Sequence, residues 1–209
     1  MSVTLPTPPD GAVQAALVSL NLTSGDRLAP LSVVYPHRVY LMDLAHVASG
    51  SSLEAAQAGP WRFLVAHNSR LEEYLDVVGT DASGRHRLAH RSRGSRSVAA
   101  GLQIVRALAA PEFSDGRLEG RMLEIPALSV TALWLAGENR SVLIPIAPAR
   151  GLNAGSQYSP DEFLAALQPA AKERLRFDNS PKPRDGAEED NTVTVTQRLD
   201  RSLTVGTPG

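Results

Sequence analysis

Residues 128–147 have the sequence LSVTALWLAGENRSVLIPIA, and this stretch decides the fold class. Two apolar runs flank residues 136–139, whose small and polar side chains are typical of a β-hairpin connection. In the first run Val130, Ala132 and Trp134 alternate with partly polar positions, so one side of the strand is wholly apolar. We therefore predict an antiparallel hairpin that packs one face against a core.

Further strands are predicted on the N-terminal side of this hairpin. Residues 33–41 are β-branched and aromatic around Pro36, which indicates strand segments that meet at an edge or a bulge. Residues 69–79 have helical spacing of apolar side chains, yet they also fit a strand that turns at 79–84 and returns along 85–91. We favour the hairpin for this region. The other predicted strands are 61–65 and 121–125.

Helices are predicted at four places. The clearest is 95–109, with Val98, Leu102, Val105 and Ala109 on its buried face. A short helix is expected at 12–20. Another, at 52–58, would begin with a capping box of Ser51 and Glu54 and end at Gly59-Pro60. Residues 159–162 are a strong helix start, and Pro169 is expected to kink or restart that helix.

These elements predict one α+β domain over residues 11–177, in which two or three helices pack on a mixed, largely antiparallel sheet. Residues 1–10 contain three prolines and are expected to be a flexible arm. Residues 178–209 have no aromatic side chain and are expected to be a disordered or extended tail. Within that tail an alternating tract could add a strand to the sheet edge of a partner or of another copy. Its core residues are Thr192, Val193, Thr194 and Val195.

Composition restricts the class of protein. The 209 residues contain no cysteine, which excludes disulfide frameworks, thiol catalysis and Cys-ligated metals. The formal net charge is −1, so the whole chain is not a polyanion binder. Basic residues are almost all arginine, which suggests a GC-rich bacterial genome. We expect a cytoplasmic protein that has no membrane segment and binds no cofactor.

The arginines are unevenly placed. No acidic residue occurs between Ala82 and Pro111, where six arginines gather before and within the 95–109 helix. Guanidinium groups beside a helix start could bind a phosphate or carboxylate. The alternative is that they pair with Glu72, Glu73 or Glu119. Nucleic acid is not expected as a partner, because no aromatic side chain lies between Tyr74 and Phe113. The candidate anion-binding residues are Arg91, Arg93, Ser95 and Arg96.

Catalytic candidates are few. Asp43, His46 and His67 could form a metal or hydrolytic site if the fold brings them together. His86 and His90 have zinc-compatible spacing only on a helix, and arginines surround them. No nucleophile elbow, phosphate-binding loop or dinucleotide fingerprint occurs, so we assign no catalytic and no metal-ligating residue.

Three functional hypotheses follow. The first is a non-catalytic interaction or accessory protein of a bacterial cytoplasm, which engages a protein partner or its own copies through the folded domain and the tail. The second is a binder of a small anionic ligand at the arginine cluster. The third is a hydrolase or metal-dependent enzyme.

Overall fold

The structure is a computed structural model of the chain. It describes residues 3–21, 31–68, 70–79, 85–93, 95–110, 113, 118–138, 140–147, 149 and 151–178, with only the backbone of 21, 95–98 and 100. The chain divides into two units, Met1–Asn179 and Ser180–Gly209, and the second lies wholly outside the described residues. The predicted tail, including Thr192–Val195, therefore also lies outside them, apart from its first residue.

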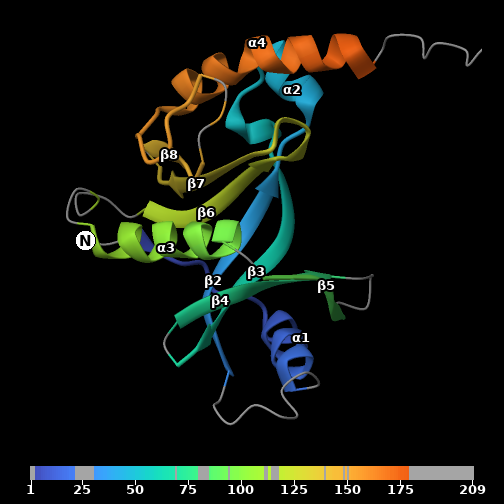
Figure 1. The fold of residues 1–209 in the computed structure, drawn as a ribbon, viewed down its shortest axis with the longest axis vertical. Helices are drawn as coiled ribbons and strands as arrows, with labels where there is room; N and C mark the ends of the chain where they lie inside the picture. The colour runs from blue at the N-terminus through green and yellow to red at the C-terminus, as the bar shows by residue number, and fades with distance from the viewer. Residues whose placement is uncertain are drawn as a thin grey trace, which may run out of the picture. The chain divides into compact units, whose positions relative to one another are not determined.

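One mixed sheet of eight strands organises the first unit, in the order β5-β4-β3-β2-β6-β7-β8, with β1 beside β6 (Figure 1). The pairs β1–β6 and β2–β6 are parallel and all others are antiparallel, which confirms the predicted fold class. The strands are β1 (Val3–Thr4), β2 (Leu31–Leu41), β3 (Gln57–His67), β4 (Arg70–Gly79), β5 (His86–Arg93), β6 (Leu118–Ile125), β7 (Val130–Ala136) and β8 (Ser141–Pro145). The helices are α1 (Asp10–Asn21), α2 (Leu44–Ser49), α3 (Ser95–Ala109) and α4 (Pro160–Asp178), with 3-10 turns η1 (Leu53–Ala55) and η3 (Pro126–Leu128).

Helices cover both faces of the sheet. On one face α3 packs over a core that includes Val39, Ile104 and Met122. On the other face α1 covers a core containing Trp61, while α2 and α4 cover a separate core containing Trp134. In Figure 1, α1 lies at one end of the sheet and α2 with α4 at the other. Both tryptophans are buried, as their places in apolar strands suggest.

The two predicted hairpins are confirmed. Strands β7 and β8 pair from Ala132–Pro145 to Ala136–Ser141, and β4 and β5 form the hairpin favoured for residues 69–91. The predicted irregularity at Pro36 is a bulge: β2 and β3 lose register between Val34 and His37, and Tyr35 has a φ of 48°. Because proline has no amide hydrogen, it falls where no ladder bond is needed.

The buried side of α3 differs from the prediction. Leu102 is 43% exposed, whereas Ile104 and Ala107 are buried. The cause is Gly101, which approaches the sheet so closely that an added Cβ would lie 2.7 Å from a Leu64 methyl. The absence of a side chain at Gly101 sets which side of the helix faces the sheet, and a pattern of apolar residues alone does not show this.

Three local predictions are corrected. Residues 1–10 include strand β1, and Val3 is buried against β6, so the segment differs from a flexible arm. The helix predicted at 52–58 is only the 3-10 turn η1, capped by Ser52 in place of Ser51. Gly59 does not end a helix but lies inside β3, where an added Cβ would lie 3.2 Å from both the Leu41 side chain and the Val39 carbonyl oxygen.

Helix α4 begins as predicted, because the Ser159 and Glu162 side chains bond each other at 2.7 Å and each accepts the other's backbone amide. It continues through Pro169 as one helix, so the predicted restart does not occur there. A proline within a helix costs about 3 kcal/mol. The packing of Leu167 and Ala171 in the core beneath α4 offsets this cost, together with a bond from Gln168 to the Ala48 carbonyl.

The turn before α4 supports a test with a matched control. Gly151 and Gly155 have φ of 80° and 76°, but only an added Cβ at Gly151 would meet the α4 backbone, 2.9 Å from the Ala166 carbonyl oxygen. Gly151→Ala is therefore expected to lower the free energy of unfolding by about 1–3 kcal/mol more than Gly155→Ala. Urea denaturation of both variants measures this, and equal losses would contradict the packing described.

Candidate functional site: the basic edge strand and its buried glutamate

Strand β5 forms one edge of the sheet, and among the described residues no strand pairs with its outer side. Arg87 and Arg93 are exposed along it, and Arg85 is exposed immediately before it. Its register with β4 shifts between Asp76 and the next residue, so β5 twists at this irregularity. The strand therefore combines unpaired backbone groups with a row of positive charge.

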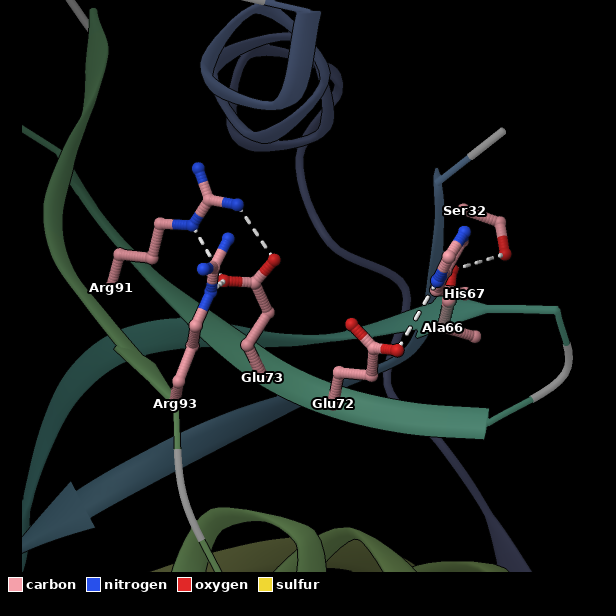
Figure 2. A network of polar contacts seen from close by, with 7 residues as sticks. All are labelled: Ser32, Ala66, His67, Glu72, Glu73, Arg91 and Arg93. Atoms are coloured by element: carbon pink, nitrogen blue, oxygen red, sulfur yellow. Dashed lines mark hydrogen bonds and ion pairs between the residues drawn. The ribbon is translucent and has the colours of Figure 1, made fainter. Parts of the chain in front are cut away.

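A buried carboxylate anchors this strand. Glu73 on β4 is 2% exposed and accepts two hydrogen bonds from Arg91, at 2.6 and 2.7 Å, and one from Arg93 at 3.0 Å. Figure 2 shows both guanidinium groups reaching the same carboxylate, while the neighbouring Glu72 turns to His67, 3.2 Å away. The predicted pairing of these arginines with a local glutamate is confirmed for Glu73.

One carboxylate serves two guanidinium groups in this cluster. Burial alone would raise the pKa of Glu73, but the hydrogen bonds and charges of Arg91 and Arg93 outweigh burial and hold the pKa below its ordinary value. Glu73 is therefore ionised at neutral pH and neutralises one of its two arginines. Arg93 keeps 59% of its side chain exposed, so the edge retains a positive charge there.

The structure brings together only two of the four residues of the predicted anion site. Arg91 and Arg93 meet, but their shared ligand is Glu73, and the side chains of Ser95 and Arg96 lie outside the described residues. The two neighbouring glutamates differ in burial, because Glu73 is 2% exposed whereas the Glu72 side chain is 39% exposed. A bulge explains the difference, because Glu72 is the extra residue between the pairs Val65–Glu73 and Ala66–Leu71.

The proposed constellation of Asp43, His46 and His67 does not assemble. Asp43 immediately precedes α2, just beyond the end of β2 at which Leu41 pairs with Gln57, whereas His67 pairs with Leu31 at the other end. Ten residues of strand separate these ends by about 30 Å. No group of three potential metal ligands occurs in the described part of the chain, and His86 and His90 lie on a strand.

A second polar cluster escaped sequence reasoning. Arg62 on β3 is 5% exposed and donates two bonds to Asp76 on β4, at 2.7 and 2.8 Å, and one to Glu124 on β6 at 2.6 Å. Its guanidinium carbon lies 4.0 Å from the centre of the Tyr74 ring. Burial would lower the pKa of Arg62, but the Asp76 and Glu124 charges raise it, so the group stays charged.

His37, opposite Arg62 in the β2–β3 pairing, is fully buried. Its Nδ1 lies 2.9 Å from the Tyr35 carbonyl oxygen, and its Nε2 has no partner. Burial lowers the pKa of His37 to about 4, opposed by the Tyr35 contact and assisted by the Arg62 charge. His37 is therefore neutral at pH 7, and the charge of this second cluster is carried by Arg62, Asp76 and Glu124.

Comparisons with known proteins found no matching family model, no similar curated protein and no similar solved structure. Within the described residues no helix is long and apolar enough to cross a membrane.

The contacts of Arg62 predict how its substitution changes the stability of the fold. Arg62→Met keeps the length of the side chain but leaves the Asp76 carboxylate buried without its cation, so it is expected to cost about 3–5 kcal/mol of unfolding free energy. Adding Asp76→Leu to Arg62→Met should recover part of the lost unfolding free energy. Arg106→Met, at an exposed position on α3, is the control and should change stability by less than about 0.5 kcal/mol. If Arg62→Met lowers the unfolding free energy as little as Arg106→Met does, the proposed role of Arg62 is contradicted.

The Glu73 cluster makes a pH-dependent prediction. A carboxyl whose pKa is lowered on folding adds stability above its ordinary value of 4.5, and this stability is lost as the pH falls through the folded-state pKa. Glu73→Gln is expected to cost about 2–3 kcal/mol at pH 7 and much less near pH 3. Urea denaturation at both pH values tests this, with the more exposed Glu72→Gln as control. A cost of Glu73→Gln that does not change with pH would refute the ion-pair assignment.

Proposed function

We propose that this chain is a non-catalytic interaction protein of a bacterial cytoplasm, and that strand β5 takes up an extended, acidic segment of a partner protein. The observation that carries the proposal is the open, arginine-bearing edge of β5. An extended segment can add to such an edge through backbone hydrogen bonds, and side-chain charges then select the segment.

Charge complementarity favours an acidic partner over a second copy of β5. Two β5 edges placed together would bring Arg87 and Arg93 of one copy close to the arginines of the other, and like charges opposite each other destabilise a strand pair. Arginines on an edge also protect a sheet against self-association. The same residues attract a segment that alternates acidic and β-branched side chains.

The buried anchor supports this use of the edge. Because Arg91 and Arg93 are tied to Glu73, the edge strand is held in a fixed conformation before any partner binds. A preformed edge loses less conformational entropy on binding than a mobile one. The tail remains a second proposed contact element, in which Thr192–Val195 would add a strand to a partner's sheet.

The alternatives have less support. A small anion at Arg91 and Arg93 would compete with the buried Glu73 carboxylate for the same donors. An enzyme based on Asp43, His46 and His67 lacks the required geometry, since the strand ends that carry these residues lie far apart.

Fluorescence polarisation with the full chain tests the proposal. The probe is a labelled ten-residue peptide of alternating Glu and Val, compared with the same peptide in which Lys replaces Glu. We expect the acidic peptide alone to bind, with an affinity that falls as salt is added. Methylating alternate backbone amides of the acidic peptide should abolish binding, because strand addition needs those donors.

Variants then locate the contact. Arg87→Glu on β5 is expected to weaken binding about tenfold, while Arg106→Glu, an exposed arginine on α3, changes it less than twofold. Equal affinity for the acidic and basic peptides, or binding that survives amide methylation, would overturn the proposal.

A further inference from the structure

Two arginines lie on neighbouring strands at the centre of the sheet, far from the β5 edge in strand order. Arg38 on β2 and Arg121 on β6 immediately precede the paired residues Val39 and Met122 of these parallel strands. Val39 and Met122 face α3, so by alternation both arginines project from the opposite face. There they lie at the seam between the core under α1 and the core under α2 and α4.

Aromatic rings hold both guanidinium groups. The Arg38 guanidinium carbon lies 5.3 Å from the centre of the Trp61 ring. That of Arg121 lies 5.0 Å from the Tyr40 ring and 5.1 Å from the Trp134 ring. Tyr40 and Trp134 meet edge to face at 5.1 Å. Stacking restricts each guanidinium plane and leaves N–H donors at its rim, one of which Arg121 gives to Glu119.

The charges at the seam are unbalanced. Glu119 accepts a bond of 2.6 Å from Arg121, and 26% of the Arg121 side chain remains exposed. Arg38 makes no ion pair with any described carboxylate, and burial lowers its pKa. Like charges on neighbouring strands destabilise a sheet, so a pair of arginines with a single carboxylate is a net positive site that lacks a counter-charge.

We propose that Arg38 and Arg121 form a binding site for a small ligand that carries an oxyanion, either a phosphate or a carboxylate. Two adjacent guanidinium groups can each donate to a different oxygen of one anion, and such charge-assisted bonds are the strongest available at a partly exposed site. The ligand supplies the missing counter-charge and removes the repulsion between Arg38 and Arg121. The site is independent of the strand-addition function proposed for β5.

Intrinsic fluorescence provides a direct measurement, because the chain has only two tryptophans and both contact these arginines. The full chain is titrated with inorganic phosphate and with benzoate, and potassium chloride at matched ionic strength is the control. We expect a saturable change in tryptophan emission with at least one of the two oxyanions. Saturation by phosphate alone assigns a phosphoryl ligand, and saturation by benzoate alone assigns a carboxylate.

Variants test whether the arginines are responsible. Arg38→Gln should weaken the binding at least tenfold and Arg38→Lys less, because lysine keeps the charge but loses the planar fork. Arg87→Gln on β5 is the matched control and should leave the affinity unchanged. Circular dichroism and thermal unfolding of each variant without ligand establish that it is folded. Thermal stabilisation by the same oxyanion gives a second readout, which should also be lost in Arg38→Gln.

Two outcomes overturn the proposal. One is that neither phosphate nor benzoate produces a saturable change beyond that of chloride. The other is that the change persists undiminished in folded Arg38→Gln. Neither outcome affects the peptide-binding proposal, which is measured with a different probe and weakened by substitution at Arg87.

Discussion

Arg62 is the residue on which the central part of the sheet depends. A buried guanidinium is tolerated only when its charge and its N–H donors are satisfied, and Arg62 takes its partners from two other strands, Asp76 on β4 and Glu124 on β6. Strand β2 lies between β3, which carries Arg62, and β6, which carries Glu124. It must therefore pair with both strands in the observed register for Arg62 to reach Glu124. A slip of one residue in β4 would turn Asp76 to the other face and leave the arginine without its main partner.

The local elements were largely predictable because their signals are short-range. The alternation and turn residues of 128–147, the continuous helix of 95–109 and the capping residues Ser159 and Glu162 all act within a few positions of the chain. The features that the sequence did not predict depend on tertiary contacts. Gly101 turns α3 because Leu64 and Leu71 lie under it, and α4 passes through Pro169 because α2 packs against it.

The candidate sites were less predictable than the fold, for a related reason. An arginine cluster is visible in the sequence, but whether each arginine is neutralised depends on strand register. Glu73 pairs with Arg93 directly across β4 and β5, whereas Arg38 and Arg121 are 83 positions apart in the chain and reach neighbouring strands only through the parallel β2–β6 pairing. No composition or spacing rule connects residues so distant, so the sequence analysis could consider only the local cluster of Arg91, Arg93, Ser95 and Arg96.

The arginines therefore differ in what they can still bind. Those whose donors are used by buried carboxylates, Arg62 and Arg91, hold strands together, and a new anion could reach them only by displacing a carboxylate that cannot return to water without unfolding. Arg87 at the sheet edge and Arg38 at the seam have no such internal carboxylate among the described residues. The net charge of −1 for the whole chain does not show which arginines are bound to buried carboxylates and which are not. The recognition of acidic groups that we propose therefore rests on the few arginines for which the described residues provide no buried carboxylate.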